Sequence, residues 1–113
     1  MIDISFEVDR EGICSGFLVR GHAGYAPRGS DIVCAAVSAL TQGAAHTLQE
    51  MKEPGAKVVQ SDAELICIID RPDIATQAIF AMVKRSLQEL ESQYSGYIKV
   101  CHGSHGTFLL SKT

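Results

Sequence analysis

Residues 29–51 read GSDIVCAAVSALTQGAAHTLQEM, and this stretch decides the fold because it predicts a long helix. Either Ser30 or Asp31 can cap the first amides of the helix, and no proline interrupts the chain until Pro54. Small side chains recur along it, at Ala35, Ala36, Ser38, Ala39, Gly43, Ala44 and Ala45. Small residues let a helix lie close to other backbones, so we expect helix 32–51 to be buried on most sides.

The chain before this helix predicts a β-hairpin. Residues 2–9 alternate apolar and polar side chains, which is the period of a strand with one buried face. Residues 10–12 suit a turn, and residues 13–21 have an apolar centre that suits a second strand. This second strand places His22 at its end.

The chain after the helix predicts a second hairpin, a second helix and a last strand. Residues 57–60 and 64–69 flank a short polar turn, and the continuous apolar run in 64–69 is typical of a central strand. Apolar side chains in 74–90 recur at the spacing of an amphipathic helix. Residues 97–102 predict the last strand, and the apolar tail after it either pairs at a sheet edge or stays loose.

These elements follow the order ββαββαβ. That order predicts an α+β fold in which two helices cover one mainly antiparallel sheet. The chain has 113 residues, which is enough to bury one modest core. We therefore expect a single domain over residues 1–113.

Composition and charge argue against several classes of protein. No stretch is apolar enough to span a membrane, and the first residues lack the pattern of a secretory signal. The four cysteines are too sparse for a disulfide scaffold, so we expect reduced thiols in the cytoplasm. The formal net charge is −3, and Lys and Arg do not cluster, so we expect no direct binding of nucleic acid.

Cys34 is the candidate nucleophile. It falls in the first turn of the predicted helix, where unpaired amides and the helix dipole favour a thiolate and can stabilise the oxyanion of a peptide under attack. Asp31 lies three residues before Cys34 and Ser38 four residues after it, so all three share one helical face. His22 is the candidate base, because an imidazole can activate a thiol and then protonate the leaving amine.

Each of these residues also has an ordinary structural interpretation. A cysteine in an alanine-rich helix is usually a small core residue, and Asp31 is explained as a helix cap. Ser38 is explained by packing, and His22 by a surface hydrogen bond at the end of a strand. Spacing alone therefore does not decide between structure and catalysis.

The combination of these residues resembles a known family. Gly21-His22-Ala23, a short loop and Gly29-Ser-Asp-Ile-Val-Cys-Ala-Ala-Val-Ser38 are similar to the signature of the ribosomal-processing cysteine protease family, called Prp. The motif covers residues 21–38, and the order of elements resembles the family along nearly the whole chain. The tail after His102 is longer than the family pattern.

The resemblance implies a cysteine endopeptidase that removes the N-terminal extension of ribosomal protein twenty-seven of the large subunit, cutting after paired aromatic residues. It implies that His22 and Cys34 are the catalytic pair, with Asp31 as an orienting or capping residue. It also implies a flexible loop over the site, a homodimer and no cofactor. Within the loop, Tyr25 is the large side chain that can pack on an aromatic substrate residue, and Ser38 is a second candidate for substrate binding.

Three alternatives remain at this stage. A non-catalytic ribosome-associated binding module would fit the size, although it should carry a basic face. Redox sensing through Cys34 would need a resolving thiol, for which Cys14 is the candidate if the fold brings it near. A metal site is suggested by Cys101, His102 and His105, but no further Cys/His pair accompanies them. We expect the other cysteines, Cys14, Cys67 and Cys101, to be inert thiols in strands.

Overall fold

The computed structural model describes residues 1–51 and 56–103, and it confirms the predicted order ββαββαβ. The elements are β1 (Ile2–Val8), β2 (Cys14–Gly21), α1 (Ile32–Met51), β3 (Lys57–Ser61), β4 (Glu64–Ile68), α2 (Ile74–Gln93) and β5 (Ile98–Gly103). Most bounds lie within one or two residues of the predicted ones. The expected pairing or looseness of the C-terminal tail concerns residues 104–113, which lie outside the described residues.

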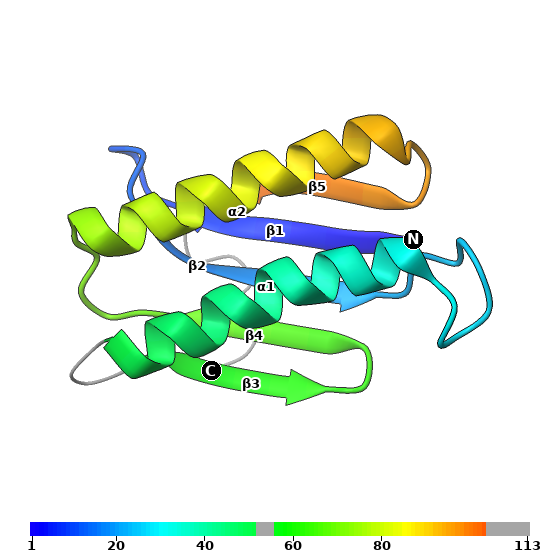
Figure 1. The fold of residues 1–113 in the computed structure, drawn as a ribbon. Helices are drawn as coiled ribbons and strands as arrows, with labels where there is room; N and C mark the ends of the chain where they lie inside the picture. Colours follow the sequence, from blue (N-terminus) through cyan, green and yellow to red (C-terminus); the bar gives the residue numbers. More distant parts are fainter. Residues whose placement is uncertain (52–55, 104–113) are drawn as a thin grey trace.

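The five strands form one sheet in the order β3-β4-β2-β1-β5. Neighbouring strands pair antiparallel except β1 and β5, which are parallel, so the prediction of a mainly antiparallel sheet is confirmed. The apolar run of β4 lies between β3 and β2, as expected for an interior strand, while β2 holds the centre. Both helices lie on the same face of the sheet (Figure 1).

The core lies between the sheet and the two helices. On β1 the apolar side chains of the alternating pattern, Ile2, Ile4 and Phe6, are almost fully buried, whereas Asp3 between them is exposed. The Phe17 ring lies 5.9 Å from Phe6 and 6.1 Å from Phe80 of α2, measured between centroids. These aromatic contacts join α2 to the middle of the sheet.

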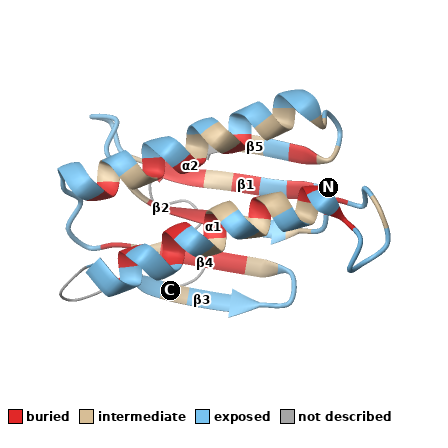
Figure 2. Cartoon of the chain, in the orientation of Figure 1, coloured by how far each residue is buried: buried red, intermediate tan, exposed pale blue. Residues whose placement is uncertain are grey.

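The helix α1 is buried along one stripe only, so the expectation that it is buried on most sides is wrong (Figure 2). Its buried residues recur at helical spacing, at Val33, Val37, Thr41, Ala44, Ala45 and Leu48. Ala35, Ala39 and Gly43 are exposed on another face. In a fold of two layers, the sheet covers only one side of a helix. Small residues on several sides of a helix do not show which side this is.

The helix α2 begins at a capping box. The Asp73 carboxylate accepts a hydrogen bond from the Thr76 amide at 2.9 Å, and the Thr76 hydroxyl accepts one from the Asp73 amide at 2.9 Å. The helix ends at Tyr94, whose amide donates to the Leu90 carbonyl. The amphipathic helix predicted here is thus confirmed, with a cap at each end.

Candidate active site

An open groove of about 550 Å³ lies between α1, the loop after β2 and the hairpin of β3 and β4. Four of the five predicted site residues line it, namely His22, Asp31, Cys34 and Ser38. Residues from β2 and α1 meet here because β2 ends on the same side of the molecule as the side on which α1 begins (Figure 1). The fold therefore brings the motif of residues 21–38 together on one side of a cleft.

Cys34 lies in the first turn of α1 and is half-buried. Its sulfur accepts a hydrogen bond from the backbone amide of Ala23 at 3.3 Å. This contact crosses from the helix to the loop, and the Ala23 side chain beside it is buried. An amide directed at a sulfur stabilises negative charge on it, which suits a thiolate nucleophile.

Asp31 is the cap of α1, which resolves the choice between Ser30 and Asp31. Its Oδ1 accepts hydrogen bonds from the amides of Val33 and Cys34, both at 3.0 Å. Its Oδ2 accepts hydrogen bonds from two amides of the loop, residue 25 at 3.0 Å and residue 26 at 3.3 Å. One carboxylate therefore fixes both the start of the helix and the loop that crosses it.

These hydrogen bonds also act on the ionisation of Asp31. The Cys34 amide lowers the pKa of the Asp31 carboxyl most; burial opposes this, and the amides of Ala26, Tyr25 and Val33 lower it further. The net result is a pKa below its ordinary value of 3.8. Asp31 is therefore a carboxylate at neutral pH and accepts hydrogen bonds without donating any.

His22 follows Gly21, the last residue of β2, and its side chain is exposed beside the groove. Gly21 has a φ of 95°, and a Cβ there would lie 2.6 Å from the Met1 carbonyl oxygen, so only glycine fits this end of the strand. Among the described residues, the His22 side chain makes no hydrogen bond, to Cys34 or to another group. The pair shares one groove but is not joined in this state.

The structure separates the two predicted substrate-binding residues. Ser38 is half-buried and lines the groove about one helical turn beyond Cys34. The Tyr25 ring instead packs against Tyr94 and Tyr97, with centroids 5.5 and 5.1 Å away, and it is not among the residues that line the groove. Tyr25 reaches the site through its backbone amide, by the bond to Asp31.

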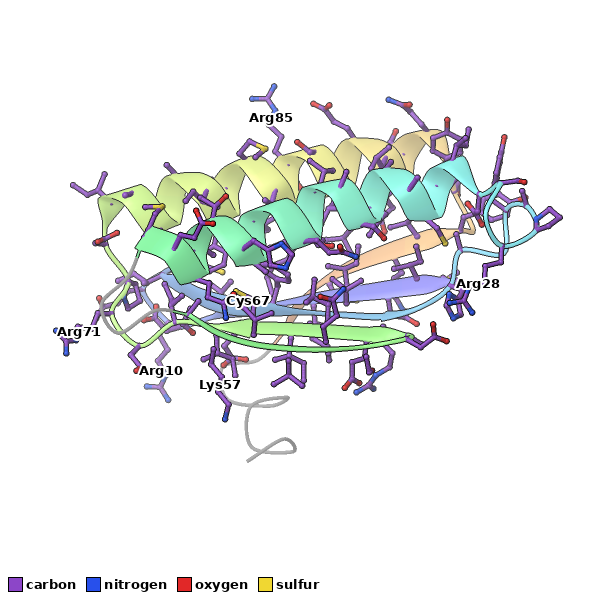
Figure 3. All side chains as sticks on the ribbon, turned by 60° about the horizontal axis from the view of Figure 1, so that its bottom comes forward. Arg10, Arg28, Lys57, Cys67, Arg71 and Arg85 are labelled. Atoms are coloured by element: carbon purple, nitrogen blue, oxygen red, sulfur yellow. The ribbon has the colours of Figure 1, made fainter. Side chains whose placement is uncertain are left out.

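The opposite wall of the groove was not predicted. Gln60, Ser61, Asp62 and Glu64 line it from β3, β4 and their turn. Arg28 of the loop forms an exposed ion pair of 2.5 Å with Asp62 across the groove, and Figure 3 shows Arg28 at this end of the molecule. No local motif marks these residues, because they approach the loop only through the sheet order. The polar turn at 61–62 was the available signal.

Two other thiols are buried and poorly suited to catalysis. Burial raises the pKa of Cys67 to about 12, with a smaller contribution from Cys14, and Figure 3 labels Cys67 within the core. Burial likewise raises the pKa of Cys14, and a backbone hydrogen bond with Gly16 lowers it by a smaller amount. Cys14 also begins β2, whereas Cys34 meets the loop beyond its end, a separation on the order of 20 Å. Cys14 is therefore too distant to act as a resolving thiol for Cys34.

No cluster of three His, Cys, Asp or Glu side chains suitable for a metal ion occurs among residues 1–51 and 56–101. His105, which belongs to the suggested metal site, lies outside the described residues. Neither helix of the described chain is long and apolar enough to cross a membrane.

Comparison with known proteins gives the family. The family model of the cysteine protease Prp matches residues 1–99. The chain is similar to the essential ribosomal processing protease Prp of Staphylococcus aureus in complex with a covalently linked product peptide, with 25% identity and a TM-score of 0.83 over 91% of this chain and 100% of that one. SMU.848 of Streptococcus mutans shares the fold, with 24% identity and a TM-score of 0.76 over 93% and 96%. No curated protein sequence matches significantly. Because the family model spans residues 1–99, the chain belongs to the Prp family of cysteine proteases.

Proposed function

We propose that this cysteine protease uses Cys34 as its nucleophile and His22 as its general base and acid. One observation carries the proposal: both residues line the same groove, and the Cys34 sulfur lies at a helix start with an amide directed at it. Asp31 supports the pair by holding the helix start and the loop. A non-catalytic binding module receives no support, since the family is one of cysteine proteases.

The reaction runs in two steps. The Cys34 thiolate forms a bond to the carbonyl carbon of the scissile peptide, and His22 gives a proton to the leaving amine as the C–N bond breaks. Water then attacks the thioester, His22 takes its proton, and the Cys34 sulfur leaves with the acid product released. Since His22 is exposed and not bonded to Cys34 in this state, a bound peptide must complete the alignment of the pair.

The helix-start amides, which the sequence suggests for stabilising the oxyanion, have hydrogen-bond partners in this structure. The helix-start amides of Val33 and Cys34 donate to the Asp31 carboxylate, and the Ala35 amide donates to the Asp31 carbonyl. These three amides are therefore already engaged. The described amide directed at the nucleophile is that of Ala23, on the loop. We assign to this amide the stabilisation of the Cys34 thiolate before it attacks the peptide.

We propose a ribosomal protein precursor as the substrate, namely ribosomal protein twenty-seven of the large subunit with its N-terminal extension, cut after paired aromatic residues. Support comes from the Staphylococcus aureus relative, a ribosomal processing protease known in complex with substrate and product peptides. An open groove of about 550 Å³ between a helix and a hairpin also suits an extended peptide.

This substrate is tested with a synthetic peptide that spans the extension encoded in the same organism, incubated with the protein and analysed by mass spectrometry. We expect one cut, directly after the aromatic pair. A matched peptide with both aromatic residues replaced by alanine should remain intact. Equal cleavage of the two peptides would contradict the proposed specificity, and an organism whose protein lacks such an extension would contradict the proposed substrate.

We also propose a cytoplasmic homodimer. A chain of this size has little core, and it leaves large apolar side chains exposed, including Ile74 at 91% and Met82 at 53%. Light scattering at micromolar concentration should give twice the 12.2 kDa mass of the chain. A mass equal to that of one chain would refute the dimer, but it would not bear on the proposed catalytic roles of Cys34 and His22.

A further inference from the structure

Three tyrosines meet behind the loop that carries His22. Tyr25 comes from the loop, Tyr94 ends α2, and Tyr97 immediately precedes β5. The Tyr25 ring meets the other two edge-on, at interplanar angles of 85° and 80°. Edge-to-face contact is a favourable geometry for aromatic rings, so the Tyr25 ring has a defined position against residues that do not line the groove.

The two receiving tyrosines form a fixed platform. The Tyr97 amide donates to the Tyr94 carbonyl at 3.0 Å, and the Tyr97 carbonyl accepts from the Ile2 amide at 2.9 Å. Both rings are partly buried and pack against the main core. The platform is therefore held by α2, by β1 and by the core, and not by the loop itself.

The backbone of the loop connects the two tyrosines of the platform to the nucleophile. The amides of Tyr25 and Ala26 donate to Asp31, and two residues before Tyr25 the amide of Ala23 donates to the Cys34 sulfur. Gly24, between them, has a φ of 70°, so without a tether this backbone is free to move. Seating the Tyr25 ring fixes three amides that face the site.

The ion pair between the loop and the hairpin is a weaker tether than the aromatic contact. The Arg28–Asp62 ion pair joins side chains that are 80% and 67% exposed, and ion pairs in water contribute little. The Tyr25 ring is 42% exposed and excludes water from its contacts with two partly buried rings. The aromatic contact therefore holds residues 23–26 from one side, and the hydrogen bonds of the Tyr25 and Ala26 amides to Asp31 hold them from the other.

We propose that Tyr25 is a positioning residue, whose ring, seated against Tyr94 and Tyr97, keeps the Ala23 amide on the Cys34 sulfur. Tyr25 acts through the backbone and does not touch the substrate. The effect on turnover rests on the proposed role of Cys34 as nucleophile, whereas the effect on the loop does not.

The test compares Tyr25→Ala with Tyr25→Phe, which keeps the ring. In the resting protein, amide hydrogen exchange at residues 23–26 should speed up in Tyr25→Ala and stay near the original rate in Tyr25→Phe. With the substrate peptide, kcat of Tyr25→Ala should fall on the order of tenfold with little change in KM, and Tyr25→Phe should restore it. Tyr97→Leu should reproduce the Tyr25→Ala result, and the double variant should add little further loss.

Arg71→Ala is the control, because it removes an exposed side chain at the opposite end of the molecule from Arg28 of the loop (Figure 3). It should change neither exchange at residues 23–26 nor kcat. Unchanged exchange at 23–26 in Tyr25→Ala would overturn the proposal whatever the kinetics, as would faster exchange spread evenly over the chain. A rise in KM with no change in kcat would indicate that Tyr25 binds the substrate and does not position the loop. If neither the original protein nor any variant cleaves the peptide, the proposed function fails. The exchange measurement still shows whether the Tyr25 ring holds the loop in place.

Discussion

Replacing Cys34 with alanine or serine abolishes cleavage of the extended peptide, with a loss of roughly 10³-fold or more, while the protein stays folded. The side chain is half-buried and small, so its removal leaves the core of Val33 and Val37 in place. Backbone amides at the start of α1 donate the hydrogen bonds to Asp31, and both variants keep these amides. Mass spectrometry measures the cleavage, and circular dichroism the fold.

Cys101→Ala is the matched control for this substitution. Cys101 is also a half-buried free thiol, but it lies on β5 and does not line the groove. Its replacement should leave cleavage largely intact. If Cys34→Ala cleaves the peptide as fast as the original protein, the nucleophile has been assigned to the wrong residue.

Replacing Asp31 with alanine should lower kcat/KM by about 10²-fold, because misplacing a catalytic group by about an ångström costs that much. Asp31 holds four amides, two at the helix start and two on the loop, so its loss releases both sides of the site together. Peptide cleavage measures the loss of activity, and thermal unfolding measures the loss of the helix cap.

Asp73→Ala separates positioning from capping. Asp73 caps α2 by the same kind of carboxylate-to-amide bond, yet it is not among the residues that line the groove. Both variants should lower the melting temperature, since each loses a helix cap. Only Asp31→Ala should lose activity. A similar loss of activity in both would mean that Asp31 acts through general stability.

The ionisation of Asp31 adds a test by pH. Its pKa is lower in the folded protein, so its stabilising effect is fully present above the unfolded pKa and is lost as the pH falls through the folded value. The difference in melting temperature between the original protein and Asp31→Asn should therefore shrink in acid. A constant difference from neutral pH to strong acid would contradict the role of the carboxylate.

The sequence predicts those elements whose burial follows a short period. Strand β1 and helix α2 show this, because alternation in one and i, i+4 spacing in the other mark a single buried face. Helix α1 has no such periodicity, because small residues occur on all of its sides. The sequence therefore does not predict that Ala35, Ala39 and Gly43 are exposed. Periodicity identifies the elements, while the layers decide which sides are covered.

The site was predictable in its motif and not in its surroundings. The family motif gave His22, Asp31 and Cys34, which the structure brings to one groove. The wall formed by β3 and β4 depends on the sheet order, which no local pattern specifies. The Tyr25 ring packs against Tyr94 and Tyr97, which are far from it in the sequence, so this contact could not be predicted from the position of Tyr25 in a loop.

The parallel pairing of β1 with β5 sets an order of events during synthesis on the ribosome. Ile2 lies opposite Ile98, so β1 waits for β5 to be synthesised before its second edge is covered. At about 5–20 residues per second, this wait lasts roughly 5–20 seconds. Tyr94 and Tyr97 are synthesised just before β5. The hydrogen bond from the Ile2 amide to the Tyr97 carbonyl therefore forms only at this stage. The nascent chain therefore exposes an open edge of β1 until β5 has been made, which makes this interval the one in which mispairing with other strands is easiest.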